Sequence, residues 1–155
     1  MKSKEIDMSA LSKILSNYKG QEGVLLPVLQ EVQAEFGRVP PEAIDGIAEA
    51  LRVFPSQVHG VLTFYSFLSI KPLGRNVIRI CKSLPCFLKN CQIIIESVER
   101  EIGIKPGETT PDGKFSFELT NCIGACDKAP AMMINHDVYG DLTAGEISQI
   151  LGEYK

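Results

Sequence analysis

Four cysteines stand in two closely spaced pairs in the second half of the chain, Cys81-Lys-Ser-Leu-Pro-Cys86 and Cys122-Ile-Gly-Ala-Cys126. Thiolates are soft ligands, and four of them around a small centre are typical of an iron–sulfur cluster or of zinc. Structural zinc sites mostly separate paired cysteines by about two to four residues, often two, so the gaps here suit zinc only loosely. A third interpretation is that the cysteines pack as small apolar residues. The residues favour iron–sulfur, then zinc, then plain packing.

The elements that must position these cysteines are two predicted strands. Residues 77–80 form a short β-rich run that ends at Cys81, and residues 115–119 alternate apolar and polar side chains before the second pair begins. Two loops can therefore converge at one edge of a sheet. Gly124 lies in the second loop and Cys86 opens a predicted helix, so both places can offer backbone N–H groups to an anionic centre.

The rest of the chain divides near Pro72-Leu-Gly74. Before this break, apolar residues recur at helical spacing and predict four helices, at about 11–18, 25–36, 40–51 and 55–68. After it, the pattern predicts a small α/β layer structure, with helices over 86–102 and from an N-cap at Thr143, and short strands at 132–134 and 138–139. We therefore expect a helical region, 1–72, followed by an α/β domain, 73–155.

Several motifs in this order resemble one family. The Cys-x4-Cys loop at a strand end is followed by Gly107-Glu-Thr-Thr-Pro-Asp-Gly113 and by Cys122-Ile-Gly-Ala-Cys-Asp-Lys-Ala-Pro130. In the first half, Leu26-Pro-Val-Leu-Gln-Glu-Val-Gln33 and Thr63-Phe-Tyr-Ser-Phe67 are similar to the same family's helical region. The chain resembles the thioredoxin-like 2Fe–2S subunit of NADH:quinone oxidoreductase (respiratory complex I), and equally that of soluble NAD(P)-linked hydrogenases and formate dehydrogenases.

The resemblance implies a fold, a cofactor and partners. The fold would be an α+β or α/β arrangement, in which an N-terminal helical region precedes a thioredoxin-like 2Fe–2S ferredoxin domain. One 2Fe–2S cluster would be bound by Cys81, Cys86, Cys122 and Cys126. The partners would be a flavoprotein subunit that binds FMN and NAD(P), and further iron–sulfur subunits of a larger complex. The first loop departs from the family, which usually has Gly-Thr where this chain has Ser83-Leu84.

Composition restricts the possible functions. A formal net charge of −3 gives no reason to expect nucleic-acid binding, and no apolar run is long enough to cross a bilayer. The first residues have neither a signal-peptide core nor the composition of a transit peptide, so we expect a cytoplasmic protein. No Gly-x-Gly-x-x-Gly or Walker-type loop occurs. The flavin and the nucleotide should therefore bind another chain, and we expect no catalytic residues in this one.

The function that we predict is electron transfer in an NAD(P)H-linked oxidoreductase complex. A soluble bacterial hydrogenase is favoured as the parent complex, with electron bifurcation left open, and respiratory NADH:quinone oxidoreductase is the alternative. A thiol–disulfide enzyme is disfavoured because the chain has no Cys-x-x-Cys pair, and a zinc-stabilised interaction module is the remaining rival.

Residues outside the two pairs have simpler interpretations. Cys91 lies five positions after Cys86 in what is predicted to be one helix, so it should point away from the site and pack in the core. His59 and His136 are isolated and are expected to be surface or packing groups. Among the aromatic residues near 64–67, at least two should pack in the core.

Overall fold

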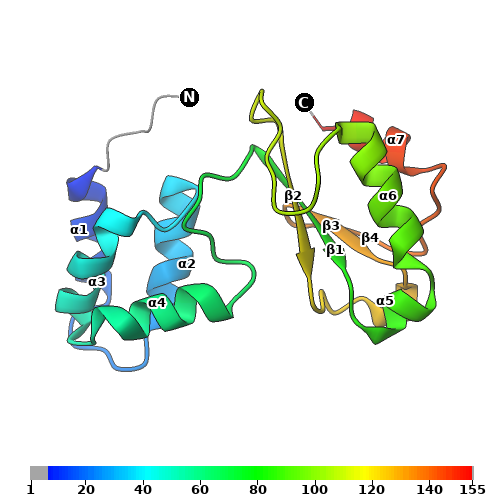
Figure 1. Cartoon of the computed structure of the whole chain (residues 1–155). Coiled ribbons are helices and arrows are strands. Elements are labelled where there is room, and N and C mark those ends of the chain that lie inside the picture. The colour runs from blue at the N-terminus through cyan, green and yellow to red at the C-terminus, as the bar shows by residue number, and fades with distance from the viewer. Residues whose placement is uncertain (1–6, 155) are drawn as a thin grey trace. The chain divides into compact units, whose positions relative to one another are not determined.

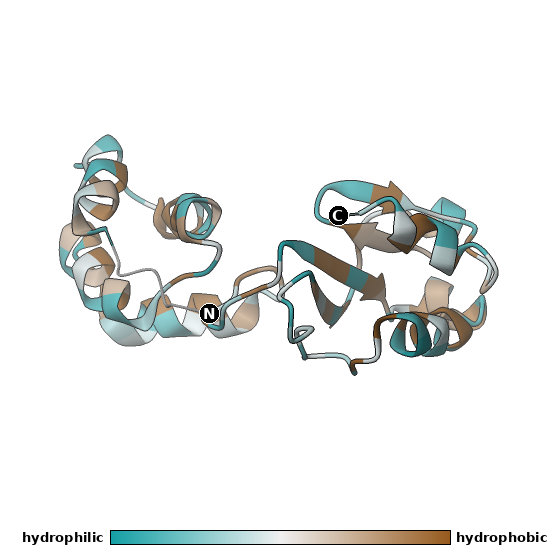
Figure 2. Cartoon of the chain, turned by 90° about the horizontal axis from the view of Figure 1, so that it is seen from above, coloured by the Kyte–Doolittle hydropathy of each residue, from teal (hydrophilic) through white to brown (hydrophobic). Residues whose placement is uncertain are grey.

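The computed structural model describes residues 7–154, and the chain forms two compact units, Met1–Pro72 and Leu73–Lys155 (Figure 1). Each unit has its own cluster of buried apolar residues. Along the helices of both units, hydrophobic and hydrophilic residues are intermixed (Figure 2). No described helix is long and apolar enough to cross a membrane.

The first unit is helical. Its elements are α1 (Met8–Asn17), α2 (Leu25–Phe36), the 3-10 turn η1 (Pro41–Ala43), α3 (Ile44–Leu51) and α4 (Pro55–Phe64). Helix α2 has the predicted bounds because Gly37, with a φ of 72°, ends it in the left-handed conformation. The predicted fourth helix ends four residues early, at Phe64, because Tyr65 adopts an extended backbone.

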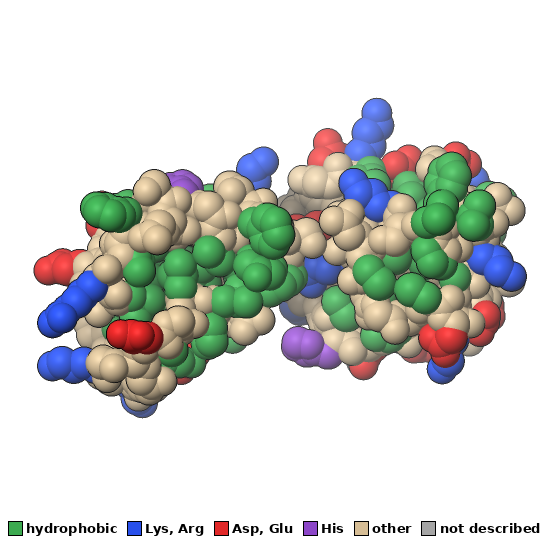
Figure 3. Space-filling view, turned by 90° about the horizontal axis from the view of Figure 1, so that it is seen from below, with side chains coloured by type: hydrophobic (Ala, Val, Ile, Leu, Met, Phe, Trp, Pro, Cys, Tyr) green, Lys and Arg blue, Asp and Glu red, His purple; other side chains and the backbone are tan. Residues whose placement is uncertain are grey.

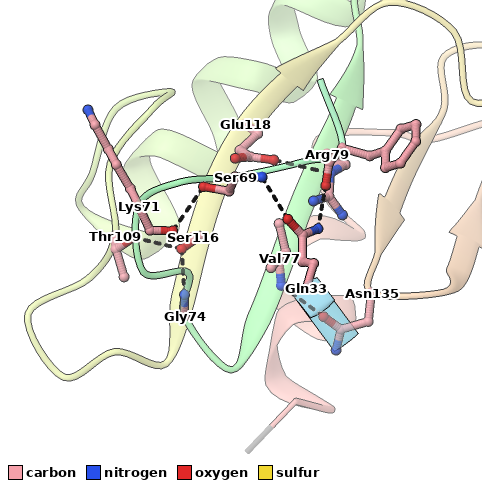
Figure 4. Close-up of polar contacts among 11 residues, drawn as sticks. Gln33, Ser69, Lys71, Gly74, Val77, Arg79, Thr109, Ser116, Glu118 and Asn135 are labelled. Atoms are coloured by element: carbon pink, nitrogen blue, oxygen red, sulfur yellow. Dashed lines mark hydrogen bonds and ion pairs between the residues drawn. The ribbon is translucent and has the colours of Figure 1, made fainter. Parts of the chain in front are cut away.

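A side chain from α2 binds the backbone of the segment that follows α4. Gln33 Nε2 donates to the carbonyl oxygen of Phe67 at 2.6 Å, and Gln33 Oε1 accepts from the Ser69 N–H at 2.6 Å (Figure 4). The side-chain amide of Gln33 therefore holds the segment that follows α4 against α2, because it both donates to and accepts from the backbone of that segment.

The second unit contains a four-stranded sheet in the order β2-β1-β3-β4. Its strands are β1 (Asn76–Cys81), β2 (Phe115–Thr120), β3 (Met132–Ile134) and β4 (Asp137–Tyr139). Strands β1 and β2 are parallel, whereas β3 is antiparallel to both β1 and β4. The parallel pair brings the carboxyl ends of β1 and β2 to the same edge.

Helices complete the second unit: α5 (Leu84–Leu88), α6 (Cys91–Ile102), the 3-10 turn η2 (Cys126–Lys128) and α7 (Ile147–Gly152). Helices α6 and α7 pack together, and their apolar faces share one core with the sheet. The buried residues of that core include Ile78, Phe117, Met132, Val98 and Ile147. The predicted mixed helical and α/β fold class is confirmed.

Two local predictions about helices are wrong. The expected single helix over 86–102 is broken into α5 and α6 by Asn90, which has a φ of 58°. The last helix does not start from an N-cap at Thr143, because α7 begins at Ile147 with Glu146 as its N-cap. Thr143 instead donates its hydroxyl to the Glu146 carboxylate at 2.7 Å and forms a preceding turn.

Polar contacts fasten the sheet at the end where β1 begins (Figure 4). The Ser116 hydroxyl accepts from the Gly74 N–H at 2.7 Å and lies 2.6 Å from the Thr109 hydroxyl. The Val77 N–H donates to the Asn135 side chain at 2.9 Å. These contacts fix the register of the strands that carry the cysteines at their other end.

Candidate metal centre

Cys81 is the last residue of β1, and the sheet holds its backbone on both sides. Its N–H donates to the Ala131 carbonyl at 3.2 Å, and the following residue, Lys82, donates its N–H to the Thr120 carbonyl at 2.9 Å. The side chain is 1% exposed, and its thiol donates to the Asn121 carbonyl at 2.7 Å. Cys81 is therefore a buried thiol on a rigid strand end, as the sequence predicts for the start of the first loop.

Cys86 comes from α5 and completes the first pair. Pro85 lies in the first turn of this helix, where a proline without an N–H is favoured. The Ser83 hydroxyl donates to the same Asn121 carbonyl as Cys81, at 2.7 Å. Cys86 is 1% exposed; its burial, with a hydrogen bond to the Cys81 side chain, raises its pKa to about 11. The two thiols of the first loop are thus buried and in contact.

Cys122 and Cys126 form the second pair in the loop after β2. Their sulfur atoms are 3.7 Å apart, and both side chains are exposed. The Gly124 N–H donates to the Cys122 sulfur at 3.4 Å. This contact uses a left-handed backbone, since Gly124 has a φ of 81°. The hydrogen bond with Cys122 raises the pKa of Cys126.

The two pairs lie near one another. The Cys81 thiol donates to the carbonyl oxygen of Asn121, the residue directly before Cys122. Within residues 7–154, however, no three His, Cys, Asp or Glu side chains are grouped for a single metal ion. The arrangement is two close pairs of thiols and not one cage of four.

Two close pairs suit a two-iron cluster better than a single zinc ion. Two thiolates on one tetrahedral ion, with bonds of about 2.3 Å, lie about 3.8 Å apart. The 3.7 Å between Cys122 and Cys126 matches this spacing. A 2Fe–2S cluster takes two cysteines on each iron, so each pair could serve one iron, whereas zinc requires all four thiolates around one point. The donor set therefore fits the cluster.

Cys91 is buried, but the expected reason is wrong. It is 2% exposed and belongs to the core of the second unit. It does not continue the helix of Cys86, because it is the first residue of α6 after the break at Asn90. Burial, and then the charge of Cys81, raises the pKa of Cys91. It belongs to the same buried core as Cys81 and Cys86.

The other residues considered from the sequence lie where expected. His59 and His136 are exposed. Tyr65 and Phe67 pack against the core of the first unit, and Phe64 is 78% exposed.

Two backbone features of the site were missed by sequence reasoning. The first is the Asn121 carbonyl that both Cys81 and Ser83 contact. It has no sequence signal, since any residue type can supply a backbone oxygen. The second is the close approach of Gly140 to the backbone of Lys128, which an isolated glycine beside a strand can indicate.

Comparison with known proteins defines the class. Residues 11–155 match the family of thioredoxin-like [2Fe-2S] ferredoxins, and the chain belongs to this family. The match confirms the family that the motifs predict, and the family's cofactor is the 2Fe–2S cluster that the resemblance implies.

The relatives are subunits of larger redox enzymes. The chain is 40% identical over 149 residues to the E subunit of NADH-quinone oxidoreductase from Escherichia coli (strain K12), and the match covers 96% of this chain and 90% of that protein. It is 35% identical over 150 residues to the corresponding protein of Pseudomonas aeruginosa, covering 97% and 90%. The NADP-reducing hydrogenase subunit HndA of Solidesulfovibrio fructosivorans is 37% identical over 134 residues, covering 86% and 78%.

The fold is also found in a solved hydrogenase structure. A crystal structure of NAD⁺-reducing [NiFe]-hydrogenase in the air-oxidized state superposes with a TM-score of 0.70 at 22% identity. The match covers 84% of this chain and 22% of the hydrogenase chain. The fold of this chain therefore also occurs as a segment of a longer redox protein.

Proposed function

We propose that this chain is an electron-transfer subunit that carries one 2Fe–2S cluster on Cys81, Cys86, Cys122 and Cys126. The observation that supports this is the presence of two close thiol pairs at one edge of the sheet, in a member of a 2Fe–2S family. When bound, such a cluster accepts and releases one electron at a time. The protein's own residues fix where the cluster lies and how much water reaches it.

The two pairs divide these tasks. Cys81 and Cys86 are buried and joined to the sheet and to α5, so they define the position of the site and keep water from its inner side. Cys122 and Cys126 are exposed. We propose that a redox partner approaches the site from this exposed side.

The partner that we propose is a flavoprotein subunit that binds FMN and NAD(P), together with further iron–sulfur subunits. A nicotinamide releases two electrons as hydride, whereas the cluster takes one, and a flavin can connect the two. The chain has no Gly-x-Gly-x-x-Gly loop for a nucleotide. The relatives are named as subunits of NADH- or NADP-linked enzymes. We infer that this chain carries electrons and that catalysis takes place on the partner.

Exposed apolar side chains on both units supply candidate docking surfaces for these subunits. Hydrophobic atoms reach the surface of each unit (Figure 3), and the largest exposed ones belong to Phe54, Phe64, Leu84, Phe87 and Leu88. We propose that the helical unit docks on the flavoprotein. Deleting the first 72 residues should leave a folded domain that binds iron but no longer co-purifies with the flavoprotein, and full assembly of the truncated chain would contradict this.

For the parent complex, we propose a hydrogenase, with the respiratory enzyme as the alternative. Relatives from both kinds of enzyme match at similar identity, 37% and 40%. The test is purification of the native complex through a tag on this chain. Hydrogen-dependent reduction of NAD or NADP by the purified complex supports the hydrogenase, and NADH-dependent quinone reduction supports the alternative. Simultaneous reduction of a low-potential ferredoxin would add electron bifurcation.

The cluster itself is tested by metal analysis. Protein purified without oxygen should be red-brown and contain about two irons and two acid-labile sulfides per chain, as four thiolates on one 2Fe–2S cluster require. Stoichiometric zinc without a visible chromophore would replace this proposal with the zinc-stabilised interaction module.

A further inference from the structure

Gly140 follows β4 and lies against the turn that carries Cys126. The Asp141 N–H donates to the Lys128 carbonyl at 2.7 Å, and the Leu142 N–H donates to the Pro130 carbonyl at 3.2 Å. These two hydrogen bonds hold the segment after β4 beside the segment that leaves the second cysteine loop.

The approach at Gly140 leaves no room for a side chain. A Cβ atom built there would overlap the Cβ of Lys128 and would lie 2.8 Å from the Lys128 carbonyl oxygen. These atoms belong to the backbone or are bonded to it, so a rotamer change of Lys128 cannot relieve the overlap. Gly140 does not need its glycine for a left-handed backbone, since it is not among the residues with positive φ. Space alone requires the glycine.

The segment around Gly140 is the better anchored of the two. On one side, Tyr139 pairs with Met132 across the sheet. On the other side, Leu142 is buried in the core of the unit. Lys128, by contrast, is an exposed residue in the three-residue turn η2, which begins at Cys126. A steric overlap between a side chain at position 140 and Lys128 should therefore displace the turn η2 and not the segment around Gly140.

We propose that Gly140 is a positioning residue for the metal centre, which sets the place of Cys126 through its contact with Lys128. This inference rests on the proposed function, because it concerns how a cluster is held. The close contact at Gly140 lets η2 lie where Cys126 is 3.7 Å from Cys122, and these two thiols would hold one side of the cluster.

The test compares three glycine-to-alanine variants of the full chain, each loaded with iron and sulfide. Gly140→Ala should change the EPR spectrum and the visible circular dichroism of the cluster. It should also speed the loss of iron to a chelator by about tenfold, the lower end of the effect of outer-shell changes on metal affinity.

The control Gly74→Ala also introduces a contact with backbone, because its Cβ would lie 2.8 Å from the Phe115 carbonyl carbon, the same distance as from the new Cβ of Gly140→Ala to the Lys128 carbonyl oxygen. Gly74 precedes β1, at the opposite end of the strand from Cys81. This variant should lower the melting temperature without altering the cluster spectrum. Gly145→Ala has no atom within 4 Å of the new Cβ and should change neither property.

A reciprocal variant tests whether the effect passes through Lys128. In the double variant Gly140→Ala/Lys128→Gly, the overlap between the two Cβ atoms is removed, whereas the 2.8 Å approach to the Lys128 carbonyl oxygen remains. The cluster spectrum should therefore return part of the way to that of the unaltered protein. If Gly140→Ala does not fold, partial recovery of a folded, cluster-bearing double variant supports the proposal, and a double variant with no recovery at all overturns it.

Two other results would overturn the inference, and they are distinguishable. If the unaltered protein binds two irons and Gly140→Ala has the same spectrum and the same iron loss, only the positioning role fails. If the unaltered protein assembles no iron and sulfide at all, the proposed function fails and the inference falls with it.

Discussion

Cys86 and Cys91 form a matched pair that can separate ligation from packing. Both are buried, with 1% and 2% of the side chain exposed, and both belong to the core of the second unit. In each, burial raises the pKa of the thiol. Replacing either by alanine removes one sulfur atom from a similar environment. Only Cys86, however, is proposed to bind iron.

The packing cost should be nearly the same in the two variants. Removing one buried group of methylene size costs about 0.8 kcal/mol, and the remaining cavity adds to this at about 24 cal/mol per Å³. We expect Cys86→Ala and Cys91→Ala each to lower the unfolding free energy of the iron-free protein by about 1 kcal/mol. For a unit of this size, that corresponds to a fall in melting temperature of about 4–8 °C.

With iron and sulfide present, the two variants should differ. Cys91→Ala should bind close to two irons per chain and keep the spectrum of the cluster, and Cys86→Ala should lose most of its iron, because a missing thiolate opens one iron to solvent. The measurements are urea denaturation of the iron-free proteins and iron analysis of the reconstituted ones. Loss of iron in Cys91→Ala with retention in Cys86→Ala would show that the four ligands are wrongly assigned.

Further predictions concern the stability of the second unit. Glu118→Gln should lower the free energy of unfolding by about 1–3 kcal/mol, because Arg79 Nε, 3.1 Å from Glu118 Oε2, would lose the negative charge that pairs with it. The double variant Arg79→Met/Glu118→Leu should be less destabilised than Glu118→Gln, because it leaves no unpaired buried charge; a larger loss in urea denaturation would contradict this. Tyr154→Phe should cost about 1 kcal/mol, since the hydroxyl contacts Tyr139 at 2.8 Å and Asp137 at 2.9 Å; an unchanged denaturation midpoint would show that these contacts stabilise nothing.

Sequence patterns predict the elements whose ends carry strong local signals. Helix α2 ends at a glycine in the left-handed conformation, and the alternation of Phe115 and Phe117 marks β2. The burial of β2 is deeper than alternation suggests, because Ser116, between the two phenylalanines, is also buried. Its hydroxyl contacts Gly74 and Thr109. Gly74 is distant in sequence, and the pattern of one strand contains no information about it.

The helix break at Asn90 has a weaker signal. Asn can end a helix in the left-handed conformation, as Asn90 does here, but the apolar spacing continues past it. In one continuous helix, residues five apart point about 140° away from each other, so Cys86 and Cys91 could not both face the core. The break allows both to be buried. The burial of both cysteines in the core thus overrides the local preference for one continuous helix. The apolar periodicity of a single sequence contains no information about such packing.

The two cysteine pairs can be predicted from spacing and motif order, but their different surroundings cannot. The first pair is fixed by a strand end and a helix that both form part of the core. The second pair lies in an exposed loop, and the segment that leaves this loop approaches Gly140 closely at Lys128. The first pair is thus buried, and the second pair is exposed. If a partner subunit covers the exposed side, cluster stability should rise on assembly more than the stability of the fold does, because the partner would remove the second pair from water.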